Sequence, residues 1–155
     1  MKNHDYMVTP IGWLKIEDED GYITQIHVAD KSGDLAPGAS SKVIEQCKRE
    51  LSEYFAGTRT EFTVPMKPVG TPFRQQVWEE LKRIKYGEVI SYKELAARIG
   101  NPKAMRAVGG ANAKNPLMLL IPCHRVIGAD GTMTGYGGGG TGNKEWLLNL
   151  EKRNG

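Results

Sequence analysis

The segment that decides the fold lies at residues 91–111 and reads SYKELAARIGNPKAMRAVGGA. Its first four residues, Ser-Tyr-Lys-Glu, form a capping box, which predicts that a short helix begins there and runs to Gly100. Asn101-Pro102 follows at once and predicts the start of another helix. Two short helices joined by a tight Gly-Asn-Pro turn are the sequence form of a helix-turn-helix.

The second helix of this pair has two different faces. The face expected to be buried carries residues at i, i+3, i+4 and i+7, which are Ala104, Ala107, Val108 and Ala111. Another face carries Lys103, Arg106 and Gly110. Small residues and cations on an exposed face would let the helix approach DNA closely, with the charges left for phosphates. The same pattern also fits an ordinary solvated helix face.

A longer helix is expected before this pair. Thr71-Pro72 supplies a cap and a proline at the first helical position. The buried stripe of this helix would be Phe73, Val77, Leu81 and Ile84. Gly87 is expected to end it.

A last helix is expected over residues 143–152. Its packed side would carry Leu147, Leu150 and Glu151, whereas Glu145 falls on the polar stripe and is expected in solvent. A carboxylate on a packed side needs a partner, so Glu151 calls for one elsewhere in the chain.

Residues 1–68 are expected to form a small domain of their own. Strand patterns lie at 13–17 and 22–28 with a hairpin turn at 18–21, and a third strand is expected around residues 6–11. Residues 61–64 are expected to add another strand before a linker rich in proline and glycine.

A helix of this first domain is predicted from Ser40 or Ser41 to Gly57. Its apolar stripe is Val43, Cys47, Leu51 and Phe55. Because Cys47 lies on that stripe, we interpret it as a packed core thiol.

Charge is divided unevenly along the 155 residues. Residues 1–70 hold 8 Lys and Arg against 11 Asp and Glu, and residues 71–155 hold 13 against 7. The basic second half is therefore the candidate nucleic-acid surface. No membrane span is expected, and two cysteines cannot make a disulfide framework, so the chain is expected to be cytoplasmic. The His and Cys spacings predict no zinc or other metal site.

The chemistry is expected at residues 119–125, which read LLIPCHR. The thiolate is the nucleophilic form of cysteine, and a free thiol with a pKa of about 8.5 is only slightly ionised at neutral pH. A base or cation near Cys123 must therefore help, and His124 is the nearest candidate in sequence. A buried structural cysteine beside a chance histidine is the alternative.

The wider pattern resembles the methylated-DNA-protein-cysteine methyltransferases, which are the O6-alkylguanine-DNA alkyltransferases. The resemblance is carried by YGEVISY at 86–92, NPKAMRAVGG at 101–110, NP at 115–116, PCHRVI at 122–127, GY at 135–136 and WLL at 146–148. It covers about residues 71–152. It implies an α/β (α+β) fold, with a ribonuclease-H-like strand-and-helix domain at 1–68 and a winged helix-turn-helix domain at 71–155.

The resemblance also implies the reaction. Cys123 would take the alkyl group from O6 of guanine irreversibly and once, with no cofactor, and the partner of a monomeric chain would be double-stranded DNA containing O6-alkylguanine. Glu151 matches the glutamate that partners the family's histidine, here His124. Because neighbouring side chains diverge, we expect a water to bridge Cys123 and His124.

Roles toward DNA come from the resemblance in the same way. Arg106 would fill the space left by the rotated nucleotide, with its helix in the minor groove. Tyr92 would crowd the 3′ phosphate and donate its hydroxyl to the purine. The other residues implied are Asn115, which holds the helix-turn-helix against the cysteine segment, Arg125 as a brace of that segment, Val126 and Cys123 through backbone groups at the purine edge, and Tyr136 against the base.

The glycine run at 137–140 departs from the family pattern. Relatives usually show Tyr-Ser-Gly-Gly, whereas this chain has Tyr136-Gly137-Gly138 and one extra residue. Gly137 is expected in a pocket wall where backbone approaches a flat base. Two other functions stay open: a noncatalytic lesion-binding relative, which would lack Cys123, and a Cys-His hydrolase.

Overall fold

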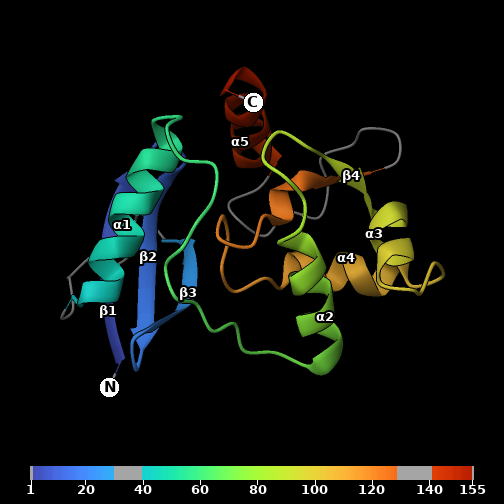
Figure 1. The fold of residues 1–155 in the computed structure, drawn as a ribbon, viewed down its shortest axis with the longest axis horizontal. Coiled ribbons are helices and arrows are strands. Elements are labelled where there is room, and N and C mark those ends of the chain that lie inside the picture. Colours follow the sequence, from blue (N-terminus) through green and yellow to red (C-terminus); the bar gives the residue numbers. More distant parts are fainter. Residues whose placement is uncertain (1, 30–39, 129–140, 155) are drawn as a thin grey trace. The chain divides into compact units, whose positions relative to one another are not determined.

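The computed structural model describes residues 2–29, 40–128 and 141–154 and divides the chain into two compact units, residues 1–69 and 70–155. We call them unit 1 and unit 2. Figure 1 shows their helices and strands. The predicted α/β fold class is confirmed.

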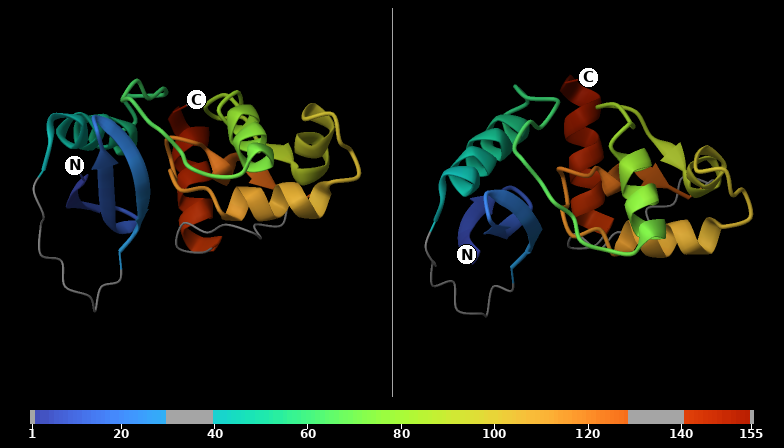
Figure 2. Two further views of the ribbon diagram at one scale, coloured as in Figure 1. Left: turned by 90° about the horizontal axis from the view of Figure 1, so that it is seen from below. Right: turned by 60° about the horizontal axis from the view of Figure 1, so that its bottom comes forward.

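Unit 1 is an antiparallel sheet covered by a helix. Strands β1 (Lys2–Thr9), β2 (Gly12–Glu19) and β3 (Tyr22–Val28) pair in the order β1-β2-β3, and α1 (Lys42–Phe55) contacts all three (Figures 1 and 2). The β2–β3 turn is tighter than the sequence suggested, because β2 runs to Glu19 and β3 begins at Tyr22, which leaves Asp20 and Gly21, both with positive φ, as the turn. The core consists of Leu14, Ile16, Ile23 and Ile26 from the sheet and Ile44, Cys47, Leu51 and Tyr54 from the helix.

Asp18 continues the buried face of β2 and joins the sheet to α1. One of its oxygens accepts from Asn3 N at 2.8 Å, and the other accepts from the hydroxyl of Ser41 at 2.5 Å. Ser41 in turn caps α1 by accepting from Ile44 N. The predicted helix start is therefore correct. On the helix stripe the prediction of Phe55 was wrong, since its neighbour Tyr54 is the buried ring.

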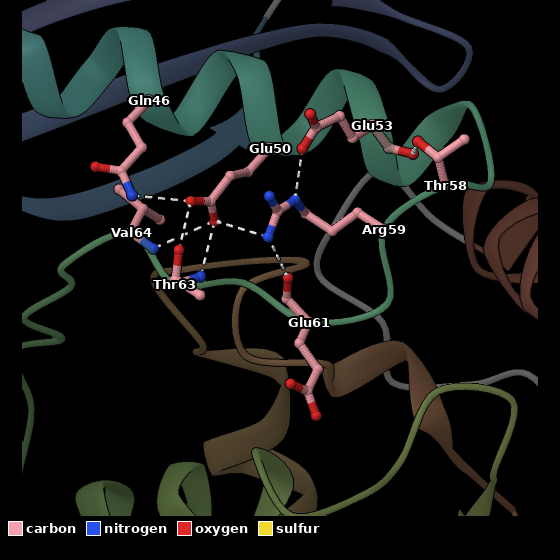
Figure 3. Close-up of polar contacts among 8 residues, drawn as sticks. All are labelled: Gln46, Glu50, Glu53, Thr58, Arg59, Glu61, Thr63 and Val64. Carbon is pink, nitrogen blue, oxygen red and sulfur yellow. Dashed lines mark hydrogen bonds and ion pairs between the residues drawn. The ribbon is translucent and has the colours of Figure 1, made fainter.

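The prediction of a strand at residues 61–64 was wrong. This segment has no ladder, and its neighbour Met66 makes a single bridge to Ile23. The carboxylate of Glu50 from α1 accepts from Thr63 N at 2.8 Å and from Val64 N at 3.2 Å, as Figure 3 shows. These backbone donors are taken by a side chain, so they are not available to a neighbouring strand.

Unit 2 is mainly helical. Helices α2 (Pro72–Leu81), α3 (Tyr92–Arg98) and α4 (Met105–Ala113) pack against one another (Figures 1 and 2). Strands β4 (Ile90–Ser91) and β5 (Val126–Ile127) pair in parallel, the short 3-10 helix η1 covers Cys123–Arg125, and α5 (Thr141–Asn154) contacts η1.

The capping signals of unit 2 are correct, but two helix boundaries were wrong. The Thr71 and Ser91 side chains cap α2 and α3. However, α2 ends at Leu81, six residues before Gly87, and a turn closed by Ile84 N and Leu81 O follows. Similarly α4 begins at Met105, because a residue before proline disfavours helical backbone and Asn101 forms a separate turn with Ala104.

The packed face of α4 is narrower than the sequence suggested. Val108, Ala111 and Asn112 are buried, whereas Ala107 is exposed. The last helix also extends beyond its expected ends, from Thr141 to Asn154.

Candidate active site

The segment at residues 115–125, here called the Cys loop, is shaped by Asn115. The side-chain amide of Asn115 donates to Ile121 O at 2.8 Å, and its oxygen accepts from Leu117 N at 2.9 Å. Between them Leu119 takes φ +75°, a conformation that typically costs a non-glycine residue about 1–3 kcal/mol. The loop is thus held in a strained shape four residues before Cys123.

A second asparagine links the Cys loop to α4. Asn112 is 1% exposed and donates from Nδ2 to Cys123 O at 3.3 Å. The adjacent carbonyl of Ala111 accepts from the indole of Trp78 on α2 at 2.9 Å. The side chain of Asn112 therefore ties the backbone of Cys123 to α4, and the side chain of Trp78 ties α4 to α2.

Glu151 joins the Cys loop to α5. Its Oε2 lies 2.6 Å from His124 Nε2, and Arg125 donates from Nε to Oε1 at 2.8 Å and from Nη2 to Oε2 at 3.0 Å. Oε1 also accepts from Gly87 N at 3.2 Å. All three side chains are buried, so the expected contact between Glu151 and His124 is present and belongs to a larger buried network.

Arg125 braces more than the Cys loop. Its Nη1 donates to Ile84 O at 2.7 Å, and its guanidinium lies 5.6 Å from the ring centroid of Tyr86. The segment after α2, the Cys loop and α5 therefore meet at one ion pair. A bidentate arginine-carboxylate pair of this kind fixes geometry as well as charge.

The electrostatics of this network keep Glu151 ionised. Burial alone would raise the pKa of Glu151, but the hydrogen bonds and charges of His124 and Arg125 hold it well below its usual range. Burial lowers the pKa of His124, so its imidazole is neutral at neutral pH. A carboxylate can only accept, so Nε2–H donates to Glu151, and in the neutral imidazole Nδ1 is the nitrogen able to accept a proton.

The thiol of Cys123 is protonated at rest. Burial raises its pKa to about 11, while a hydrogen bond with Asn115 and the charge of Lys144 act in the opposite direction. A buried thiol of this kind is a weak nucleophile until its proton is removed.

Tyr92 lies at the start of α3, against α4. A Cβ added to Gly109 would stand 3.9 Å from the Tyr92 ring, which is an ordinary van der Waals contact and places the ring beside α4. Burial and the neighbouring Cys123 raise the pKa of Tyr92, and contact with Asn112 lowers it. The structure thus brings Tyr92 into the surroundings of Cys123.

The remaining predicted residues are more dispersed. Lys103, Arg106 and Gly110 are exposed on or beside α4, and Val126 is buried in β5 opposite Ile90. Tyr136 and Gly137 lie outside the described residues.

Among the described residues of unit 2, sequence reasoning missed two buried polar residues, Asn112 and Lys144. Helical spacing could have indicated that both residues lie on packed faces. Asn112 is four residues after Val108, and Lys144 is three before Leu147 and seven before Glu151. Among the described residues, no group of three or more His, Cys, Asp or Glu is placed to hold a metal ion. No helix in the described part of the chain is long and apolar enough to cross a membrane.

Comparison with known proteins bears on both units. The ribonuclease-like domain model of 6-O-methylguanine DNA methyltransferase matches residues 3–68, and the DNA-binding domain model of the same family matches residues 72–153. The constitutive methylated-DNA–protein-cysteine methyltransferase of Bacillus subtilis is 43% identical over 151 residues, covering 93% of this chain and 92% of that protein.

Solved structures agree with these matches. The O6-methylguanine methyltransferase of Mycobacterium tuberculosis superposes with a TM-score of 0.88 at 41% identity, over 100% of this chain and 95% of that chain. The same organism's OGT in complex with DNA gives a TM-score of 0.89 at 41% identity, over 98% of this chain and 94% of that chain. With both of its domains matched in order, the chain belongs to the 6-O-methylguanine DNA methyltransferase family.

Proposed function

We propose that Cys123 accepts the alkyl group that this protein removes from O6 of guanine in duplex DNA. The activity is that of its family: the chain is a methylated-DNA–protein-cysteine methyltransferase, which repairs DNA by transferring an alkyl group to its own cysteine. The observation that carries the assignment is the buried His124–Glu151 contact at 2.6 Å beside Cys123, in the unit that also holds the helix-turn-helix.

The transfer is an in-line displacement at carbon. The Cys123 thiolate attacks the alkyl carbon, the new S–C bond forms as the C–O6 bond breaks, and the electron pair of that bond stays on the departing guanine. The hydroxyl of Tyr92 donates to the purine and so stabilises the charge that develops there. A thioether is a far poorer leaving group than a thiolate, so each molecule reacts once.

His124 removes the thiol proton through a bridging water. Nδ1 receives the proton while Nε2–H remains on Glu151, whose ionised carboxylate fixes the tautomer and stabilises the imidazolium that forms. Arg125 keeps Glu151 in this orientation through two further hydrogen bonds. The thiolate therefore forms only when the bridging water and the buried His124–Glu151 pair are both in place.

DNA is bound through α4, and the target nucleotide is rotated out of the duplex. The reacting carbon is hidden in stacked DNA, and extrusion costs a few kcal/mol. Arg106 and Lys103 are exposed on or beside α4, so Arg106 can enter the vacated space while Lys103 contacts phosphate. Backbone groups of Cys123 and Val126 face the purine edge in this scheme.

Two finer points belong to the same proposal. The chain acts as a monomer, which light scattering with and without DNA tests directly. It works in the cytoplasm, where reducing conditions keep the Cys123 thiol available.

Intact mass measurement after incubation with duplex DNA containing O6-methylguanine tests the function. The protein should gain a single methyl group, and peptide mapping should place it on Cys123. Cys123→Ala should gain none while still binding the duplex. A methyl group on Cys47, or repeated turnover without any gain in mass, would overturn the assignment and favour a different reaction.

A further inference from the structure

The side-chain oxygen of Asn112 is a polar atom that the fold leaves without a partner. Asn112 lies on the packed face of α4 with Val108 and Ala111 and is 1% exposed. Its Oδ1 is buried and accepts no hydrogen bond from the part of the chain that the structure describes. A buried acceptor without a donor destabilises a protein, and an apolar side chain of similar shape would avoid that cost.

The orientation of this amide is fixed by the backbone of Cys123. Nδ2 of Asn112 donates to Cys123 O at 3.3 Å. A carbonyl oxygen only accepts, so exchanging the two ends of the amide would set two acceptors against each other. The hydrogen bond with Asn112 also lowers the pKa of Tyr92, which is the effect of a donor to the phenol oxygen. The amide nitrogen therefore serves the active site, and the oxygen remains for a donor from another molecule.

Asn115 shows how a purely structural asparagine is used in the same region. Its Nδ2 donates to Ile121 O at 2.8 Å, and its Oδ1 accepts from Leu117 N at 2.9 Å. Both ends of that amide are taken by the backbone of the Cys loop. In Asn112 only the nitrogen is taken by backbone, so shaping the loop does not account for its oxygen.

The alkylated base carries one donor that suits this oxygen. Alkylation at O6 removes the hydrogen from N1 of guanine, so the 2-amino group holds the only N–H hydrogens of the base in DNA. Cys123 is 3% exposed, and Asn112 is hydrogen-bonded to the same residue. A base that reaches the sulfur of Cys123 therefore comes close to the Asn112 amide by the same route.

We propose that Oδ1 of Asn112 accepts a hydrogen bond from the 2-amino group of the alkylated guanine, which makes Asn112 a specificity-determining residue of the transfer. This inference rests on the proposed role of Cys123 as the alkyl acceptor. Asn112 moves neither the alkyl group nor a proton. It favours bases with a 2-amino group over 6-alkoxypurines that lack one, because a buried acceptor rejects a ligand that leaves it without a donor.

The first experiment changes the amide and the amino group together. Single-turnover methyl transfer is measured by intact mass with two duplexes that differ only in the target base, O6-methylguanine or O6-methylhypoxanthine, which lacks the 2-amino group. The proteins are the wild type, Asn112→Leu and Asn149→Leu, the last being an exposed asparagine of α5 that serves as the matched control. The wild type should prefer O6-methylguanine. This preference should fall about tenfold in Asn112→Leu, as expected for one buried hydrogen bond, and should stay unchanged in Asn149→Leu.

The same preference in the wild type and in a folded Asn112→Leu protein would overturn the proposal and leave a bound water as the donor to Oδ1. An equal loss of preference in Asn149→Leu would overturn it as well. Failure of the wild type to accept a methyl group from either duplex would instead overturn the proposed function, on which this inference depends.

The second experiment does not depend on the folding of an Asn112 variant. Cys123→Ala cannot accept the methyl group, so it binds both duplexes unreacted, and carbon-13 NMR follows the Cγ of its labelled asparagines. A hydrogen bond to Oδ1 deshields Cγ, so the Asn112 resonance should lie further downfield with O6-methylguanine than with O6-methylhypoxanthine, while that of Asn149 should be the same with both. An identical Asn112 resonance in the two complexes would overturn the proposal even if Asn112→Leu does not fold.

Discussion

Each unit buries one cysteine and one glutamate, but the two pairs are built differently. In unit 1, Glu50 accepts hydrogen bonds from the neutral groups of Gln46, Thr63 and Val64, and its ion pair with Arg59 Nη1 is long, at 4.0 Å (Figure 3). In unit 2, the donors to Glu151 include an imidazole and a guanidinium. The two glutamates are equally buried, but only the carboxylate of Glu151 is hydrogen-bonded to an imidazole and a guanidinium among the described contacts.

The cysteines show the same contrast. Burial and the charge of Glu50 raise the pKa of Cys47 to about 12. Cys123 is also raised by burial, but Asn115 and Lys144 oppose the change. In unit 1, burial and Glu50 both disfavour ionisation of Cys47. In unit 2, Asn115 and Lys144 favour ionisation of Cys123 and so counteract the effect of burial.

The largest expected effect concerns these thiols. Cys123→Ala should abolish methyl transfer, because burial and Glu50 both keep the other thiol, Cys47, protonated, while Cys47→Ala should retain the wild-type rate. Single-turnover transfer from labelled O6-methylguanine duplex measures both. Loss of transfer in a folded Cys47→Ala protein would break the contrast.

The carboxylates should separate rate from stability. Glu151→Gln should slow methyl transfer about a hundredfold, the lower end of what positioned acid-base groups contribute, and leaving Arg125 without its anion should cost about 3–5 kcal/mol of stability. Glu50→Gln should cost about 1–3 kcal/mol and leave the rate unchanged. Transfer rates and urea unfolding curves, taken well below both melting temperatures, measure the two effects. A slowed Glu50→Gln protein of normal fold would contradict this division.

Surface arginines offer a weaker contrast. Arg59 of unit 1 is held by Glu53 at 2.7 Å and by Glu61 O at 2.9 Å, whereas Arg106 on α4 is exposed. Arg106→Ala should slow transfer from duplex DNA about tenfold more than transfer from free O6-alkylguanine base, because the free base needs no extrusion. Arg59→Ala should affect neither substrate. Equal losses on both substrates in Arg106→Ala would place Arg106 in the chemistry instead.

The smallest effects are expected in acid. Folding lowers the pKa values of Glu50 and Glu151, so each carboxylate stabilises the protein above its ordinary pKa of 4.5, and that stability is lost as pH falls toward the folded value. Folding also lowers the pKa of His124. Below about pH 6.5 the imidazole is protonated in the unfolded chain but neutral in the folded protein, so its burial then lowers the free energy of unfolding. Urea unfolding at pH 7, 5.5 and 4 should show a decrease of about 1 kcal/mol in the first interval that His124→Gln removes and Glu50→Gln does not. An identical decrease in His124→Gln would show that the imidazole does not titrate as described.

Local sequence signals gave the elements of both units because they depend on few residues. The side-chain caps of Thr71, Ser91 and Ser41 act over three positions and are present as expected. The helix start predicted at Asn101-Pro102 was wrong, because Asn101 forms a turn with Ala104 and α4 begins only after it. The strand predicted at residues 61–64 was wrong, because the carboxylate of Glu50, more than ten residues away, accepts from the backbone N–H groups of Thr63 and Val64.

By itself, the sequence determined the chemistry on offer: a cysteine followed by histidine and arginine, a glutamate on the packed side of the last helix, and a basic second half with a helix-turn-helix. Tertiary structure alone decided how these groups share charge. Glu151 holds Arg125 as well as His124, and Lys144 is buried beside Tyr92 instead of lying in solvent. The physical reason is that desolvation and ion pairing depend on which distant elements come into contact. Helical periodicity predicts the face of the helix on which a residue lies, but not which element packs against that face.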